Sequence, residues 1–195
     1  MTVPAWTAEA QAELRARRRT QAFATQLATT RLLVGFDEHD EALVAATRGV
    51  VAASAGDVAE KFYAHLLAHR ETASAFTRAD GRIDRELVAA RHDSLRAWLI
   101  AAVEAPLDER LAAYLAGIAR AHTGRGTSKG ARVKARYMVA AMSFLQTSLI
   151  AVLGVSGLDA DTLLETISAW NKLLMVHLDL FLAVYGGAGG SAHWY

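Results

Sequence analysis

Apolar residues recur at intervals of three and four along nearly the whole chain, and this periodicity constrains the fold more than any other feature. Such spacing places one buried face on an α-helix, which turns by about 100° per residue. Only two prolines, Pro4 and Pro106, interrupt the 195 residues, and no segment shows the sustained alternation of a β-strand. We therefore predict an all-α protein, and this length fits one domain with a sizeable core better than two.

Turn and capping residues divide the periodic pattern into helices. The first is expected at about residues 7–20 and, because it is polar, on the surface. A long helix is expected to follow Asp37 as its N-cap, to pause near Gly56 and to resume after a second cap at Asp57. The remaining helices are expected at about residues 84–103, 106–123, 131–153 and 159–185.

Charge and composition exclude several classes of function. There are 21 basic and 20 acidic residues, a net charge of +1, so no overall field attracts nucleic acid or an anionic membrane. The absence of cysteine excludes disulfides, thiolate metal sites and a cysteine nucleophile. The arginines near the N-terminus have no apolar run beside them, so we expect no secretory signal and a cytoplasmic protein.

Residues 137–158 carry no charge and are numerous enough to cross a bilayer as a helix. They include serine, threonine, glutamine and glycine, whose polar groups would need partners in lipid but can be satisfied inside a folded core. No second segment is comparable. We therefore expect a core helix and no membrane span.

A histidine closes one otherwise aliphatic helix face. The face is formed by Leu111, Leu115 and Ile118, and His122 follows one turn later, just before a glycine-rich loop. On this pattern alone, a core histidine bonded to a nearby carbonyl is the more common outcome. The alternative is a metal or heme ligand, because a neutral imidazole on an apolar wall is what holds heme iron.

Two further side chains are candidates for the same chemistry. His92 shares a helix face with Leu95 and Leu99, so it would point inwards, either as a core residue or across a flat cofactor towards His122. Tyr63 lies on another predicted buried face. A buried phenol needs a partner for its hydroxyl, either the backbone or a bound ligand.

His65 and His69 have the i, i+4 spacing of a helical metal site. Their directions lie about 200° and 240° around the helix from that of Tyr63. We therefore interpret them as a solvated or interhelical pair.

Four groups of residues follow one another between residues 33 and 185. They are Leu33-Val34-Gly35-Phe36 with Asp40 and Leu43; Phe62-Tyr63-Ala64-His65-Leu66-Leu67 with Glu71, Thr72 and Phe76; Ile118-Ala119-Arg120-Ala121-His122 with Gly126; and Asn171-Lys172-Leu173-Leu174 with Asp179 and Tyr185. In order and spacing, these groups resemble the globin domains of globin-coupled sensors and protoglobins. Each group is weak by itself, and their combination makes the resemblance specific.

The resemblance implies a globin fold, a 3-over-3 helical sandwich, with an extra N-terminal helix. It also implies heme b (iron protoporphyrin IX), with His122 as the proximal iron ligand and Tyr63 as the distal hydrogen-bond donor. Phe76 would pack on the porphyrin, and His92 is an alternative distal iron ligand. The other residues expected to line the cofactor are Leu95, Leu99, Ile118, Tyr137 and Met142.

The function implied by the resemblance is binding of a diatomic gas (O2, CO or NO) by an oxygen or redox sensor. The heme domain would span residues 33–186, after a helical extension at 1–32 and before a flexible tail at 187–195. Such domains usually form homodimers through the last two helices, and a separate signalling partner would receive the output. Two alternatives stay open: a heme enzyme of the NO dioxygenase or peroxidase type, and a non-heme globin module for dimerisation and signalling.

The chain departs from the family pattern at several positions. Ala119 stands where glycine is common, and Leu115 stands where an arginine is often found. The loop at residues 123–134 lacks the usual proline and aromatic residues and is basic instead, which favours the non-heme alternative. Arg91 and Arg96 flank the inward face of the helix that carries His92, so this wall is more polar than the family leads us to expect.

Overall fold

Helices account for nearly all of the backbone in the computed structural model, which describes residues 7–123 and 133–185. They are α1 (Ala8–Leu33), α2 (Glu38–Ala46), α3 (Arg48–Ala68), α4 (Arg70–Ala73), the 3-10 turn η1 (Ser74–Phe76), α5 (Arg85–Glu104), α6 (Glu109–His122), α7 (Ala135–Gly154) and α8 (Ala160–Ala183). Within the described ranges, the only β pairing is an isolated bridge between Thr77 and Ile83. The predicted all-α class is confirmed.

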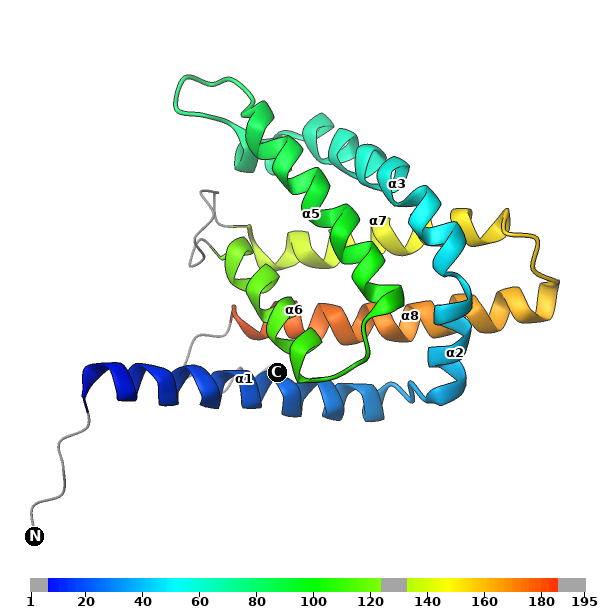
Figure 1. The fold of residues 1–195 in the computed structure, drawn as a ribbon. Coiled ribbons are helices and arrows are strands. Elements are labelled where there is room, and N and C mark those ends of the chain that lie inside the picture. The colour runs from blue at the N-terminus through cyan, green and yellow to red at the C-terminus, as the bar shows by residue number, and fades with distance from the viewer. Residues whose placement is uncertain (1–6, 124–132, 186–195) are drawn as a thin grey trace, which may run out of the picture.

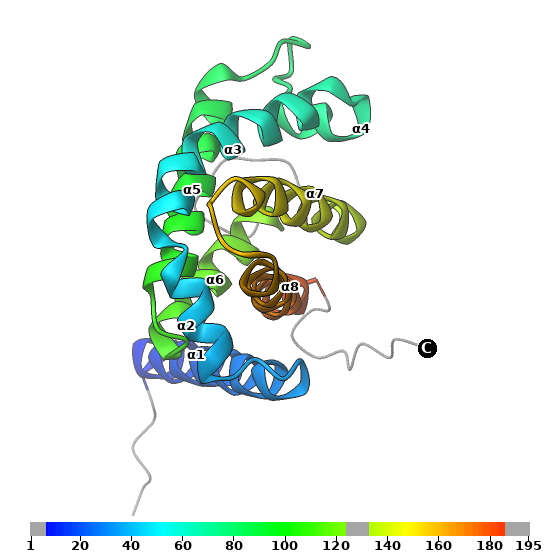
Figure 2. The same ribbon diagram turned by 90° about the vertical axis from the view of Figure 1, so that its right-hand side faces the viewer.

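The helix α8 lies at the centre of the packing. It contacts α1, α2, α6 and α7, while α3 packs against both α5 and α7. Figure 1 shows α7 and α8 running across the molecule, with α3 and α5 at the top and α1 along the bottom. In Figure 2, α7 and α8 are seen nearly end-on, beside the wall that α2, α3 and α5 form. The core therefore lies between this wall and the α7–α8 pair.

Aspartate side chains begin four of the helices. Asp37, Asp84, Asp108 and Asp159 each accept backbone N–H groups of the first turn, which would otherwise lack partners. The predicted start of a helix at Pro106 is wrong by three residues. Because the Asp108 carboxylate caps the first turn, α6 begins at Glu109 and the proline lies in the preceding connection.

The break predicted near Gly56 is also wrong. α3 runs through Gly56 and Asp57, and the chain bends by 65° at Thr47 instead, between α2 and α3. Thr47 Oγ1 donates to the Val44 carbonyl at 2.7 Å and accepts the indole N–H of Trp170 at 3.2 Å. A side chain of α8 thus stabilises the bend, whereas the glycine needs no special backbone angle.

The first helix is much longer than predicted. α1 has 26 residues and continues to Leu33, because no helix breaker precedes Gly35, whose φ of 65° suits glycine. The first half of α1 is exposed, as predicted, and Figure 1 shows it extending past the other helices. The second half is attached to α8, since Asp179 accepts hydrogen bonds from Gln26 (2.7 Å) and Thr30 (2.6 Å).

The uncharged stretch forms most of α7. By length and composition alone, α7 could cross a membrane, and α2 and α3 pass the same criterion together as a bent pair. Only 28% of the apolar part of α7 is buried, although the helix packs against α3 and α8. The predicted tail at 187–195 and most of the basic loop, residues 124–132, lie outside the described residues.

Candidate heme site

His122 ends α6, and its imidazole is oriented by its own helix. The Nδ1 atom lies 2.8 Å from the Ile118 carbonyl oxygen one turn earlier. Because a carbonyl oxygen can only accept, Nδ1 carries the proton and Nε2 keeps its lone pair. Burial lowers the pKa of His122, so the ring is neutral. A histidine bonded to a core carbonyl and a histidine prepared for metal ligation are therefore the same arrangement.

Tyr63 lies on α3 beside Phe76, the last residue of η1. Their rings pack edge to face with centroids 5.8 Å apart, and Phe62 packs on Tyr63 in the same way at 5.2 Å. Burial raises the pKa of Tyr63 to about 12, which keeps the phenol protonated. None of the hydrogen bonds among the described residues uses the Tyr63 hydroxyl. It is therefore a largely buried donor that a ligand can accept from.

The positive charge of Arg91 acts on both groups. Burial dominates the pKa shifts of Tyr63 and His122, and the electrostatic effect of the Arg91 guanidinium is a secondary cause of each. The effect is short-ranged in a folded protein, so α5 brings one cation near the phenol of α3 and near the imidazole of α6. Sequence reasoning noted Arg91 only as a polar flank and missed this role.

The expected lining residues lie at different depths. Leu99 and Met142 are buried in the core, and Leu95 and Ile118 pack against it with part of their surface exposed. Tyr137 differs, because two cations approach its ring: Lys134 Nζ at 5.8 Å and the Arg136 guanidinium carbon at 5.2 Å from the centroid. Its surroundings are thus cationic.

The start of α7 lies close to His122. The Val133 N–H donates to the His122 carbonyl at 2.9 Å, immediately before the helix that carries Tyr137 and Met142. This bond joins the end of α6, where His122 lies, to the segment that leads into α7. Tyr137, in the first turn of α7, therefore follows closely after the residue that bonds to His122.

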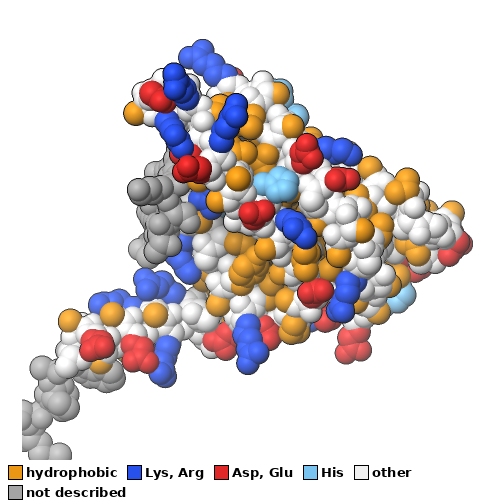
Figure 3. All heavy atoms as spheres, turned by 45° about the horizontal axis from the view of Figure 1, so that its top comes forward, with side chains coloured by type: hydrophobic (Ala, Val, Ile, Leu, Met, Phe, Trp, Pro, Cys, Tyr) orange, Lys and Arg blue, Asp and Glu red, His pale blue; other side chains and the backbone are white. Residues whose placement is uncertain are grey.

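His92 lies on α5, one turn before Leu95. It lines a surface hollow of about 500 Å³, and its Nδ1 is 3.8 Å from the carboxylate of the neighbouring Asp93. The other lining residues are Leu67, Ile83, Arg85, Val88 and Ala89. Figure 3 shows the face formed by the upper helices, where apolar side chains gather between scattered charges. Neither Tyr63 nor His122 lines this hollow.

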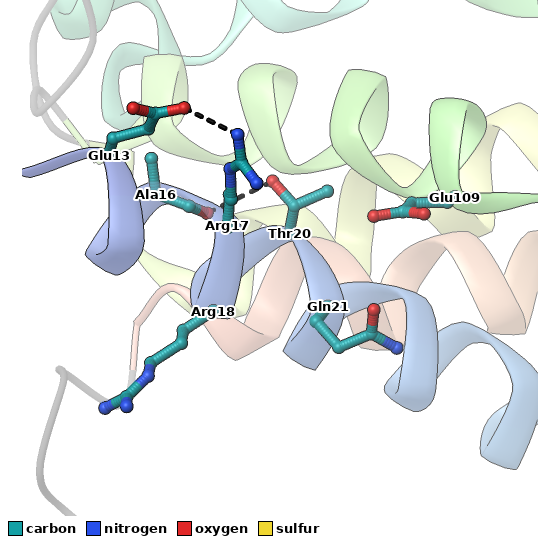
Figure 4. Close-up of a pocket in the computed structure, with 7 residues that line it drawn as sticks. All are labelled: Glu13, Ala16, Arg17, Arg18, Thr20, Gln21 and Glu109. Atoms are coloured by element: carbon teal, nitrogen blue, oxygen red, sulfur yellow. Dashed lines mark hydrogen bonds and ion pairs between the residues drawn. The ribbon is translucent and has the colours of Figure 1, made fainter. Parts of the chain in front are cut away.

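A second hollow, of about 570 Å³, lies in the groove between α1 and α6 (Figure 4). Charged and polar side chains of α1 surround it, including the 2.7 Å ion pair between Glu13 and Arg17, with Glu109 on the α6 side. It contains none of the predicted site residues. A planar apolar cofactor does not match this lining.

His65 and His69 were expected to be a solvated or interhelical pair; both are exposed, and His65 also makes an interhelical contact. The two rings lie 4.7 Å apart, and His65 stacks on Phe144 of α7 at 4.6 Å. Throughout the described ranges, no group of three or more histidine or acidic residues is arranged to hold a metal ion. His65 therefore joins α3 to α7 through Phe144.

Comparison with known proteins identifies the family. The protoglobin family model matches residues 23–189. The chain belongs to the protoglobin family. The comparison with curated proteins finds no match.

Solved structures of related globins share the fold. The globin domain of the Geobacter sulfurreducens globin-coupled sensor is 21% identical, with a TM-score of 0.66, over 82% of this chain and 97% of its own. The ferric globin domain of E. coli DosC is 16% identical, with a TM-score of 0.64, over 82% of this chain and 99% of its own. The predicted globin fold is confirmed.

Two of the protoglobin-like segments meet in the structure. Lys172 Nζ of α8 donates to both carboxylate oxygens of Asp40, at 2.8 and 3.0 Å, and to the Gly35 carbonyl at 3.0 Å. Asn171 accepts a 2.7 Å bond from Gln146 of α7. These residues thus have structural roles, holding α8 against the α1–α2 connection and against α7.

Proposed function

We propose that this protoglobin-family chain binds heme b through His122 and uses it to bind a diatomic gas, as an oxygen or redox sensor. The observation that carries the proposal is the 2.8 Å contact between His122 Nδ1 and the Ile118 carbonyl. It orients the ring and leaves Nε2 as a neutral nitrogen donor, which is how proteins prepare histidine for a metal. The family membership supports the same cofactor.

The surrounding residues fit such a group chemically. Leu95, Leu99 and Ile118 offer apolar surface to a porphyrin, and Phe76 offers an aromatic ring beside Tyr63. When bound, the heme iron supplies the position at which O2, CO or NO is held.

The protein groups then determine how a bound ligand is stabilised. The Tyr63 phenol, which stays protonated to about pH 12, would donate a hydrogen bond to it. Met142 would pack at the inner side of the group, and Tyr137 with its two neighbouring cations would lie at the outer side. We assign His92 no iron-binding role, since it lines a separate hollow.

Absorption spectroscopy of the heme-reconstituted protein tests the proposal. We expect a Soret band that is lost or strongly altered in His122→Ala. The matched control is His39→Ala, because His39 is exposed and pairs with Glu165 on the surface. An absent Soret band, or an unchanged spectrum in His122→Ala, would contradict the proposal and favour the non-heme alternative.

Variants of Tyr63 and His92 separate cofactor binding from ligand binding. Tyr63→Phe should retain the Soret band and release O2 about fivefold faster, since one hydrogen bond contributes about 1 kcal/mol. The CO dissociation rate should change less. His92→Ala should leave the ferrous, ligand-free spectrum unchanged; a switch from six- to five-coordinate iron would make His92 a ligand.

We further propose a homodimer through α7 and α8. Val139 and Ile150 lie on one face of α7, with 49% and 40% of their surface exposed, and Leu164 of α8 is 66% exposed. The interhelical bond between Gln146 and Asn171 lies along this same side of the pair. A second copy covering this face would complete a four-helix bundle.

A further inference from the structure

Trp98 and His177 form a buried hydrogen bond between α5 and α8. The indole Nε1–H of Trp98 donates to His177 Nδ1 at 3.2 Å, and the two residues are 3% and 0% exposed. An indole nitrogen is only a donor, so His177 Nδ1 must be unprotonated and the ring proton must lie on Nε2. Complete burial also lowers the pKa of His177 to about 3, so the imidazole stays neutral.

This tautomer leaves the buried, protonated Nε2 of His177 without a hydrogen-bond acceptor among the described residues, which is unfavourable in a core. A buried donor without a partner destabilises a fold, whereas an aliphatic side chain would fill the same space without that cost. What histidine adds at this position is an acceptor for Trp98.

Phe181 connects this pair to the proximal histidine. It follows His177 by one turn of α8, and its ring centroid lies 6.1 Å from that of Trp98 and 6.5 Å from that of His177. The ring centroid of His122, on α6, lies 6.5 Å from that of Phe181. The four aromatic rings therefore form one continuous contact from α5 through α8 to α6.

Trp98, the α5 residue of this series, is close in sequence to two residues that are expected to line the heme. They are Leu95 and Leu99 of the same helix. Packed aromatic side chains resist independent movement, because protein interiors are as dense as organic crystals. A displacement of α5 therefore changes the packing of Phe181 on His122.

We propose that Trp98 and His177 are positioning residues that set the orientation of His122 through Phe181 and couple the α5 wall to the proximal ligand. This inference rests on the proposed heme site. His122 is then held by two restraints: its own bond to the Ile118 carbonyl, and the packing of Phe181.

The chain contains a matched control for this inference. Trp170 also lies in the core and also donates its indole N–H over 3.2 Å, to Thr47 Oγ1, and it belongs to the same helix as His177. Its bond, however, joins α8 to the α2–α3 bend rather than to the wall near His122. Trp170→Phe therefore removes an equivalent bond without touching the proposed coupling.

The experiment compares Trp98→Phe with Trp170→Phe in the heme-loaded protein. Resonance Raman spectra should show a shifted iron–histidine stretching frequency for Trp98→Phe only. The dissociation rate of the gas ligand should change about 2- to 30-fold in Trp98→Phe, the range typical of coupling residues. His177→Gln, which keeps an acceptor, should restore part of the wild-type frequency relative to His177→Leu.

Equal shifts in Trp98→Phe and Trp170→Phe would overturn the inference, as would no shift in Trp98→Phe. If Trp98→Phe fails to fold, Phe181→Leu tests the last contact of the series by the same spectra. Should wild-type protein give no Soret band, the proposed heme site fails first. NMR of the heme-free chain then still decides the coupling, because solvent exchange of the His122 Nδ1 proton should be faster in Trp98→Phe than in Trp170→Phe.

Discussion

At the scale of single residues, burial keeps two histidines neutral. His122 and His177 both have a pKa lowered first of all by burial. A neutral His122 keeps the Nε2 lone pair that iron ligation requires. A neutral His177 keeps the acceptor that Trp98 needs. Burial therefore maintains both the lone pair on His122 and the hydrogen-bond acceptor on His177.

The lowered pKa of His177 predicts acid-sensitive stability. Its ordinary value of 6.5 falls to about 3 in the folded state, so the unfolded chain binds the extra proton between these values. The contribution is fully present above pH 6.5 and is lost as the pH falls towards 3, by about 1.4 kcal/mol per pH unit. Urea unfolding of wild type at pH 7, 6, 5 and 4 measures this slope.

The variant His177→Leu tests the slope of unfolding free energy against pH. In His177→Leu the pH dependence should be shallower by roughly that amount, with a smaller residual slope from His122, whose pKa is also lowered. An unchanged slope in His177→Leu would show that this histidine does not titrate on unfolding.

At the scale of elements, contacts between helices override local propensity. The sequence favours a break at Gly56, yet α3 continues through it and the bend forms at Thr47. The deciding contact is the bond from Trp170, which lies 123 residues away in the chain. Several helix starts were predicted better than this bend, because capping depends on local chemistry. The predicted cap Asp37 is observed, and Asp84 and Asp159 cap helices at the predicted starts.

Removing the Thr47 hydroxyl should destabilise the fold through this bend. Thr47→Val keeps the shape of the side chain but leaves the buried Trp170 N–H without its acceptor, at a cost of about 1–3 kcal/mol. The Val44 carbonyl loses the hydroxyl bond but keeps the backbone N–H of residue 47. Thr47→Ser keeps the hydroxyl and should lose less. Thermal or urea unfolding measures both. A serine variant as unstable as the valine variant would assign the effect to packing instead.

At the scale of the whole molecule, α8 unites the fold and α7 leaves part of its surface uncovered. α8 contacts α1, α2, α6 and α7, and its polar residues Lys172 and Asp179 bond to the α1–α2 region. α7 is the most apolar of the long helices, and yet only 28% of its apolar stretch is buried. This imbalance is what a second copy against α7 and α8 would remove.

A charge on the uncovered face should therefore separate the proposed dimer. Ile150→Lys places an ammonium group on that face, and sedimentation velocity should show a change from dimer to monomer. Leu32→Lys is the control, because Leu32 is 79% exposed on α1 and belongs to neither α7 nor α8. A monomeric wild type, or a dimer that persists in Ile150→Lys, would contradict the α7–α8 interface.

The sequence alone determined the helical class, the globin resemblance and the order of the candidate residues, because helix periodicity and capping are local and motif spacing is linear. It placed His122 and Tyr63 on buried faces, and both lie largely buried. Only the tertiary structure decided which nitrogen of His122 is free, that Arg91 acts on both groups, and that His92 lines a surface hollow. It also joined Trp98, His177 and Phe181 to His122. These features depend on side chains from helices far apart in the chain, and their contacts exist only once the helices have packed.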